Sequence, residues 1–463
     1  MKNLRASALG RVIALALPAI LENVMFTLVN IVDTIMVGSL GPAATAATAL
    51  NAPPAWLARS ISMSIAGGAT VLVARHWGAG DYEAAGRCSR QALTLSLILG
   101  AALTLTAQLI TPHYPLWMRA ETPVVADAAA YMSITGGAQV FTVVSFVLYG
   151  VLRGSGDTVT PMIVSSLTNL MNVIGNFLLI YPSRTLDAFG GIPLWGAGLG
   201  VRGAAISTAL SVGMAGVAML FILARRTDAL KIRWGQSFRL CRSQSGAILK
   251  VGLPIAGERV AISGGQVLFM SIVSGLGTIS VAGHYLATTA EGICYNPAFG
   301  FSAAATTLTG QALGAGDEKT AQTYGRICIN LCAAVMTVVS VAMYLFAPQM
   351  IGLFSDNAQV IAQGAMALRI VSFAEPLFGV SLAATGALRG AGDTMIPLWT
   401  GIVCMLGLRM ASAVFFVQVL QIGLAGAWYA MDIDTGLRGI ILWGYFCTGR
   451  WKKRSRELAR APS

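Results

Sequence analysis

The sequence RGSGDTVTP at residues 153–161 returns as RGAGDTMIP at residues 389–397, with six of nine positions identical. The two copies are 236 positions apart, and the same interval relates Pro18 to Pro254. A fixed interval that holds over much of a chain indicates an internal repeat, in which each copy is one structural unit. We therefore interpret the chain as two related halves.

The composition places both halves in a membrane. Of the 463 residues, 56% are hydrophobic and 11% are charged, and the mean hydropathy is +0.70. A soluble domain carries roughly a quarter of charged residues. Apolar runs such as 12–37, 91–111 and 203–224 are long enough to cross a hydrocarbon core of about 30 Å as helices. Twelve such segments are expected, so the sequence predicts an all-α membrane protein with twelve transmembrane helices.

The repeat divides these helices into two six-helix lobes. Because six is an even number, both lobes enter the membrane with the same orientation, and such parallel repeats flank a central cleft that suits alternating access. The expected domains are an N-lobe with helices 1–6 over residues 1–224, a basic cytoplasmic linker over 225–246, a C-lobe with helices 7–12 over 247–448, and a basic cytoplasmic tail over 449–463.

The repeated phrases are predicted to lie in cytoplasmic connections, between the fourth and fifth helices of each lobe. A second pair, WGAGD at residues 77–81 and LGAGD at residues 313–317, joins the second and third helices. Glycine permits a tight turn, aspartate caps the start of a helix, and proline suits a first helical turn. We therefore interpret both phrases as hinge and cap chemistry, used once in each lobe.

The net charge of +12 is distributed unevenly along this topology. With a cytoplasmic N-terminus, the outer loops carry only Arg119, Arg184 and Arg202, and most other Lys and Arg residues fall on the inner side. This is the positive-inside pattern of a multi-pass protein of the inner membrane, with both termini in the cytoplasm. The basic segments are expected near anionic lipid headgroups, and their placement argues against nucleic acid as a partner.

No motif indicates an enzyme. GLGVRG at residues 198–203 fits GxGxxG, but it follows an outer loop, opens a predicted membrane helix and lacks an acid near the required spacing. The seven cysteines and three histidines form no metal or nucleophile constellation, so we expect neither a metal site nor a cofactor.

Asp33 is the most informative single residue, because it lies inside the first predicted helix, where an unpaired carboxylate is costly and marks a functional site. Asn30 lies one turn earlier on the same side. Glu22 is eleven residues earlier, which returns to nearly the same helix face about 16 Å away. The first helix thus carries a polar stripe with two carboxylates. The alternative is an acid neutralised by its neighbours, for example Arg59 of the second helix.

The fifth predicted helix carries a second polar stripe. Asn169, Asn172 and Asn176 are spaced by three and four residues, which places them on one helix face. Asparagine in a membrane often only joins helices. However, the residues one repeat later at the positions of Asn169 and Asn172 are Met405 and Leu408, which are apolar. A polar cluster that is present in only one lobe favours a functional role. Gln139 of the fourth helix is a further candidate.

The second half holds its own predicted intramembrane acids, Glu258, Glu291 and Glu375, which are candidates for cation coupling or substrate contact. Acids and bases are about balanced in this lobe, which also fits a structural charge network, and its further members are Arg369, Arg409, Asp432, Asp434 and Arg438. Asp434 and Arg438 are four residues apart and are expected to form an ion pair.

Several stretches together resemble the multidrug and toxic compound extrusion (MATE) transporters: LPAILENVMFTLVNIVDTIMVGSLG (17–41), VLRGSGDTVTP, GALRGAGDTMIP and the closing GRWKK. The resemblance covers nearly the whole chain and is closer to the DinF-like bacterial branch than to NorM-like members. It implies that Asp33, Asn172 and Asn176 form an N-lobe cation site. Some members carry a second acid at the position of Asn176. NorM-like members place a sodium site in the C-lobe, so Na⁺ is possible here without an assigned site.

The resemblance also implies a function: a monomeric secondary antiporter that exports amphipathic, often cationic organic compounds by alternating access, in exchange for H⁺ or Na⁺. One alternative is a flippase of lipid-linked saccharides in the same superfamily, which would favour a large cationic cavity. A channel or a structural membrane subunit is the alternative from a different class. The sequence leaves the coupling ion and the substrate range open.

Overall fold

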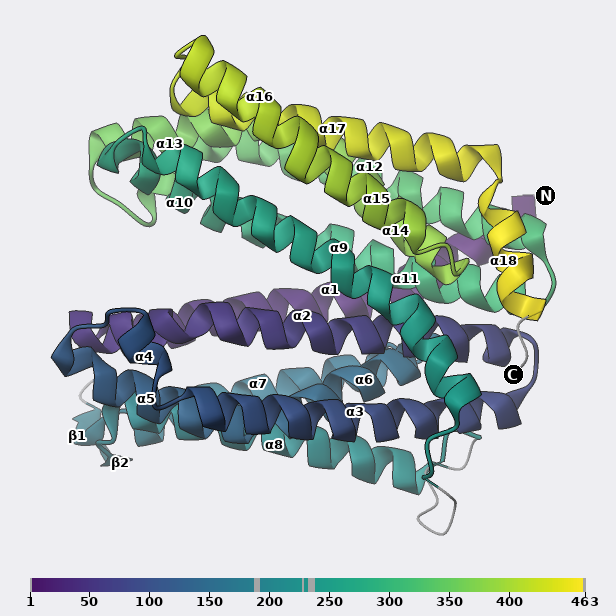
Figure 1. Cartoon of the computed structure of the whole chain (residues 1–463), viewed down its shortest axis with the longest axis horizontal. Coiled ribbons are helices and arrows are strands. Elements are labelled where there is room, and N and C mark those ends of the chain that lie inside the picture. The colour runs from purple at the N-terminus through teal and green to yellow at the C-terminus, as the bar shows by residue number, and fades with distance from the viewer. Residues whose placement is uncertain (1, 187–191, 227–228, 232–237, 461–463) are drawn as a thin grey trace.

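The computed structural model describes residues 2–186, 192–226, 229–231 and 238–460, and these are almost entirely helical (Figure 1). The first lobe contains α1 (Lys2–Gly38), α2 (Pro42–Gly78), α3 (Tyr82–Ile110), α4 (Tyr114–Trp117), α5 (Thr122–Gly137), α6 (Gln139–Ser155), α7 (Val159–Leu179) and α8 (Gly200–Arg225). An antiparallel hairpin of β1 (Pro182–Leu186) and β2 (Ile192–Ala197) joins α7 to α8.

The second lobe repeats this order. It contains α9 (Arg242–Ser274), α10 (Thr278–Cys294), α11 (Asn296–Gly314), α12 (Glu318–Gly352), α13 (Ala358–Val371), α14 (Glu375–Gly390), α15 (Met395–Ile402), η2 (Val403–Arg409), α16 (Met410–Val414), η3 (Phe415–Val419) and α17 (Leu424–Thr448), and α18 (Trp451–Arg460) follows it. The helix α9 begins inside the segment expected as a linker, and the described part of the basic tail contains the helix α18.

These elements form twelve rods, as the sequence predicts. The fourth rod of each lobe is broken at the same place: α5 and α6 meet at 46°, and α13 and α14 meet at 55°. Seven helices of the described residues are long and apolar enough to span a membrane individually, and nine spans result if each bent pair counts as one. The segments α15 to η3 continue as one rod with π-helical turns.

The two lobes lie side by side and diverge toward one end (Figure 1). The diverging end carries the β1–β2 hairpin and α13, and the other end carries α18. We call the latter the closed end, because α2 and α11 approach each other there. Gln311 on α11 donates a hydrogen bond to the carbonyl oxygen of Gly154 at 2.9 Å, and Arg75 on α2 donates one to Ala391 at 2.7 Å. Both repeated phrases therefore take part in contacts between the lobes.

Within each lobe, small residues allow two helix backbones to touch. A methyl group on Gly150 of α6 would lie 2.6 Å from the carbonyl oxygen of Ala66 on α2. The repeat-related Gly386 of α14 would meet the carbonyl oxygen of Ser302 on α11 in the same way. Close approach at small residues is the usual basis of helix packing in membranes, where burial of apolar surface gives little net driving force.

The turn chemistry expected of WGAGD and LGAGD is confirmed in both copies, since Asp81 caps α3 and Asp317 caps α12. For the longer phrases, the glycine turn is confirmed in both copies and the cap in one. Gly156 and Gly392 both adopt positive φ angles, of 95° and 77°. Asp157 accepts a hydrogen bond from the backbone N–H of Thr160 at 3.0 Å and so caps the start of α7. The capping prediction is wrong for Asp393, because its carboxylate accepts a hydrogen bond from the Tyr445 hydroxyl instead.

Asp157 also contacts the end of the N-lobe, since Arg226 donates to its carboxylate at 2.8 Å. Burial alone would raise the pKa of this carboxyl, but the hydrogen bonds from Arg226 and Thr160 outweigh burial and hold the pKa below its usual range. The carboxylate therefore stays charged near neutral pH and connects the α6–α7 turn to the end of α8.

The helix α18 bridges both lobes at the closed end. Arg75 of the N-lobe donates to the Ser455 hydroxyl at 2.6 Å, and Arg456 forms an ion pair with Glu318 of α12 at 2.7 Å. Trp451 is fully buried and stacks on Phe446 of α17 at a centroid distance of 5.3 Å. The basic tail is thus packed against the protein through this part of its length.

Two glycines at the closed end give a test of the interlobe contact. A methyl group on Gly78 would lie 1.9 Å from the carbonyl oxygen of Gln311, and one on Gly314 would meet that of Arg75 at 2.0 Å. Since backbone atoms cannot move aside locally, Gly78→Ala and Gly314→Ala should push the lobes apart here, at a cost of about 1–3 kcal/mol. Hydrogen–deuterium exchange should show faster uptake over residues 77–82 and 311–317.

Gly213→Ala on α8 is the matched control, because a methyl group at Gly213 meets nothing within 4 Å. Its uptake over the same two segments should equal that of the unaltered protein. Equal uptake in all three variants would mean that the closed end is not held by this contact.

Candidate functional site

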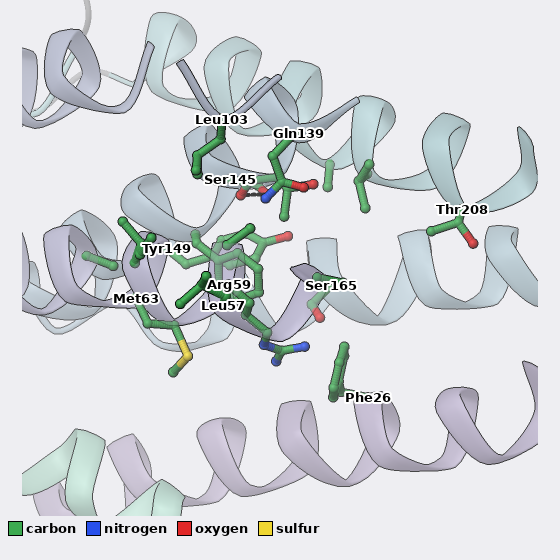
Figure 2. Close-up of a pocket in the computed structure, with 18 of the residues that line it drawn as sticks. Phe26, Leu57, Arg59, Met63, Leu103, Gln139, Ser145, Tyr149, Ser165 and Thr208 are labelled. Carbon is green, nitrogen blue, oxygen red and sulfur yellow. Dashed lines mark hydrogen bonds between the residues drawn. The ribbon is translucent and has the colours of Figure 1, made fainter. Parts of the chain in front are cut away.

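A cavity of about 640 Å³ lies between the lobes and is lined by side chains of both. Figure 2 shows part of its N-lobe wall. Its wall contains aromatic and methionine side chains, which suit an apolar ligand of variable shape, among them Phe26, Met63, Met132, Phe146 and Tyr149. Most lining residues belong to the N-lobe, and the C-lobe contributes from α9, α11 and α14.

The carboxylate of Asp33 lies in this wall and is held by amides of α7. Asn176 donates to Oδ1 of Asp33 at 2.5 Å. The Asn172 side chain fits best with its nitrogen toward Asp33, and this nitrogen then reaches Oδ1 and Oδ2 at 2.9 and 3.0 Å. The two asparagines lie four residues apart on one face of α7, and that face packs against α1. The candidate stripes of the first and fifth helices are therefore in contact.

Two residues that the sequence analysis missed extend this cluster. Thr208 of α8 lies 3.4 Å from the Asn172 side-chain amide, and Tyr131 of α5 interacts with Thr208. Both line the cavity. Neither is acidic or an amide, and each lies in a helix with several other polar residues, so no feature of the sequence singled it out.

The remaining N-lobe candidates also line the cavity, but among the described residues none of their side chains forms a hydrogen bond with Asp33. Asn30 donates to the carbonyl oxygen of Phe26 in its own helix at 2.8 Å. Gln139 lies at the start of α6. The amide nitrogen of Asn169 is buried and has no hydrogen-bond partner in the described part of the chain. Asn169 is thus a donor in the cavity wall that a ligand could satisfy.

Glu22 forms an ion pair rather than a free carboxylate. Arg153 approaches both of its carboxylate oxygens at 2.6 Å. In the C-lobe, Arg389 and Glu258 form the repeat-related pair at 2.7 Å. The arginine of each repeated phrase therefore neutralises the acid of its lobe's first helix. The interpretation of the phrases as hinge and cap alone is too narrow, because a carboxylate inside the membrane requires a partner.

A second group of acids lies inside the C-lobe. Glu375 is 1% exposed, and both of its carboxylate oxygens lack a hydrogen-bond partner among the described residues. Glu291 is buried, and it interacts electrostatically with Tyr295, with Glu375 and with Asp432 of α17. These side chains do not line the central cavity.

The expected pair of Asp434 and Arg438 is confirmed, at 2.7 Å. Arg409 approaches the same carboxylate, also at 2.7 Å, and Asp434 is fully buried. One acid and two arginines thus join η2 to α17. Arg369 lies apart from this network, with its guanidinium 5.8 Å from the ring centre of Tyr344.

A family model described as MatE matches residues 18–178 and 254–415, once in each lobe. The chain belongs to the MatE family. The "Probable multidrug resistance protein NorM" of Thermotoga maritima is 30% identical over 444 residues, covering 96% of this chain and 93% of the relative. The "Uncharacterized transporter YisQ" of Bacillus subtilis is 23% identical over 95% of this chain and 93% of its own length.

Solved structures agree with this assignment. A MATE in complex with MaD3S matches with a TM-score of 0.88 at 25% identity, over 98% of this chain and 97% of that one. A multidrug resistance MATE family transporter of the MOP superfamily, in its outward-facing conformation, gives the same four values. This MatE chain is therefore a multi-pass membrane transporter of a multidrug efflux family and not an enzyme. Its branch within the family stays a prediction.

The Glu22–Arg153 pair of this MatE protein predicts a non-additive effect on stability. Glu22→Gln leaves a partly buried guanidinium without its counter-charge, which should lower the free energy of unfolding by about 1–3 kcal/mol. The double substitution Glu22→Gln with Arg153→Gln removes both charges and should be less destabilised than Glu22→Gln alone. Thermal unfolding in detergent, followed for the three proteins, measures this difference.

The pair Glu258–Arg389 is the internal comparison, because it occupies the repeat-related position in the other lobe and should behave in the same way. Strictly additive losses in both pairs would show that neither ion pair is coupled.

Proposed function

We propose that this MatE protein is a secondary active antiporter of the inner membrane, with both termini in the cytoplasm. It exports amphipathic, often cationic organic compounds in exchange for H⁺ or Na⁺. The observation that carries the proposal is Asp33, a carboxylate in the cavity wall that amides hold and with which no arginine or lysine of the described residues forms an ion pair. The multidrug names of the relatives support an organic substrate and disfavour a saccharide flippase.

The orientation of the cleft supports export. The closed end carries the repeated phrases and α18, and the positive-inside rule assigns these basic segments to the cytoplasm. The diverging end then faces outward, which agrees with the likeness to an outward-facing transporter. Transport would follow when the contacts at the closed end break and those at the outer end form.

The amides around Asp33 offer a way to couple ion and substrate. Hydrogen bonds from an N–H group to a charged carboxylate are stronger than those to a neutral acid. A proton or cation on Asp33 therefore weakens its bonds to Asn172 and Asn176 and loosens the contact of α1 with α7. The two access states would differ in this contact, and an ion that prefers one state shifts the population toward it.

The C-lobe acids offer a second route for a cation. Glu258 is neutralised by Arg389, which removes it from the unpaired candidates. Glu291 and Glu375 remain, with Asp432 beside them, in a site that the central cavity does not reach. Oxygen ligands of this kind suit a hard cation such as Na⁺.

The first prediction of the proposal concerns Asp33→Asn. The substitution keeps the size and the polarity of the side chain but removes its charge, so export of a fluorescent cationic dye from proteoliposomes should fall by an order of magnitude or more. Asp127→Asn on α5 is the matched control, because Asp127 does not line the cavity, and it should leave export unchanged. Full export by Asp33→Asn, at normal insertion and folding, would contradict the proposed role.

The coupling ion follows from the same assay with separate gradients. A pH gradient alone should drive export through Asp33, since one carboxylate can carry one proton. If instead a sodium gradient drives export, Glu375→Gln should abolish this drive and Asp127→Asn should not. Absence of drive by either gradient would exclude an antiporter and favour a channel or a structural subunit.

A further inference from the structure

Two of the arginines that line the central cavity form no ion pair with a described residue. Four arginines line it: Arg59, Arg153, Arg259 and Arg389. Two of them are neutralised within their own lobes, one by Glu22 and one by Glu258. For Arg59 of α2 and Arg259 of α9, the described residues provide neither an ion pair nor a hydrogen bond to the guanidinium, which leaves two cationic groups without counter-charges.

Aromatic rings hold the guanidinium of Arg59. Its central carbon lies 3.9 Å from the ring centre of Phe26, 5.0 Å from that of Phe146 and 5.6 Å from that of Trp56. Figure 2 shows its terminal nitrogens directed toward Phe26 and Ser165, in the space between helices. Its Nε atom is buried, and no partner for it lies in the described part of the chain. The rings cover the faces of the cation and leave its N–H edge unsatisfied.

The surrounding charges do not compensate the two arginines. Arg259 acts on Arg59 more strongly by repulsion than Glu22 does by attraction. Likewise, Arg389 acts on Arg259 more strongly than Glu258 does. Each unpaired guanidinium therefore lies in a field of positive sign, although charges buried in a protein are normally paired. A negatively charged ligand would compensate this positive potential and would accept hydrogen bonds from the unused N–H donors.

We propose that Arg59 and Arg259 form an anion-binding subsite in the central cavity, which takes the carboxylate or phosphate group of an amphiphilic compound. Guanidinium groups suit this chemistry, because their fork of N–H donors matches the paired oxygens of such groups. The aromatic wall around Arg59 receives the apolar part of the same compound. The inference rests on the proposed function, since it describes a substrate class for that cavity, and it extends the class from cations to amphiphilic anions.

Two compounds that differ only in charge test the subsite. Pyrenebutyrate carries a carboxylate on an aromatic body, and its methyl ester is the uncharged match. Isothermal titration calorimetry on the full chain, in nanodiscs of phosphatidylcholine, should show the carboxylate bound about tenfold more tightly than the ester or better. This comparison uses the unaltered protein, so it does not depend on the folding of any variant.

Substitutions then test whether the preference for the carboxylate over the ester depends on Arg59 and Arg259. The double variant Arg59→Gln with Arg259→Gln should bind both compounds equally, and its residual signal also measures their partition into lipid. Arg59→Lys retains the charge and should keep part of the preference. Arg369→Gln is the matched control, because Arg369 lies over Tyr344 in the C-lobe and outside the cavity lining. It should leave the preference unchanged.

The anionic group could belong to a free compound or to a lipid headgroup, and the nanodisc composition separates these sources. If phosphatidylglycerol weakens binding of pyrenebutyrate in the unaltered protein but not in the double variant, the subsite accepts lipid headgroups. If phosphatidylglycerol has no effect, the subsite serves free amphiphiles. Equal affinity for the acid and the ester in the unaltered protein would overturn the proposal, as would a preference that survives the double substitution.

The proposal of an anion subsite and the proposal of an antiporter can be refuted independently of each other. If gradient-driven export of the cationic dye persists while the carboxylate shows no preference, only the anion subsite is refuted. If no gradient drives export of any compound but the preference is present and depends on both arginines, the subsite stands and the antiporter mechanism is refuted.

Discussion

A carboxylate inside a membrane must find a cation, and each lobe of this transporter satisfies that constraint in the same way. Glu22 on α1 meets Arg153 at the end of α6, and Glu258 on α9 meets Arg389 at the end of α14. The pair fixes the first helix of a lobe against its fourth rod, because separation would leave a charge without a partner in a poorly solvating medium. The same phrases that supply the arginines also form contacts between the lobes.

The two lobes share this frame but differ in the chemistry placed on it. Asp33 of the N-lobe has Phe269 as its counterpart one repeat later, so the amide-held carboxylate exists in one lobe only. The C-lobe instead buries Glu291, Glu375 and Asp432 away from the cavity. A duplicated scaffold with unlike charges suits a transporter, because its halves can move as equivalent bodies while ion and substrate interact with different sites.

The central cavity presents groups of opposite charge at separate places on its wall. Asp33 lies seven residues beyond Phe26 on α1, a displacement of about 10 Å along the helix and nearly the same face. Arg59 lies over Phe26. A compound with charge at either end could therefore find a complementary group, while its apolar body contacts the aromatic wall. Selectivity then depends on which charged end of the compound meets a group of opposite charge in each access state.

The sequence by itself determined the class of fold, the repeat and the helices that carry polar stripes, because these follow from composition and periodicity along one chain. It also singled out Asp33, since an acid within an apolar run is rare whatever surrounds it. It could not show that Glu22 is neutralised by Arg153, which is 131 positions away. It also could not show that no described residue forms an ion pair with Arg59 or Arg259. Pairing depends on which faces of distant helices meet. Only the tertiary structure decided that, because helix packing in a membrane is set by close contacts of small residues and not by any periodicity that one helix displays alone.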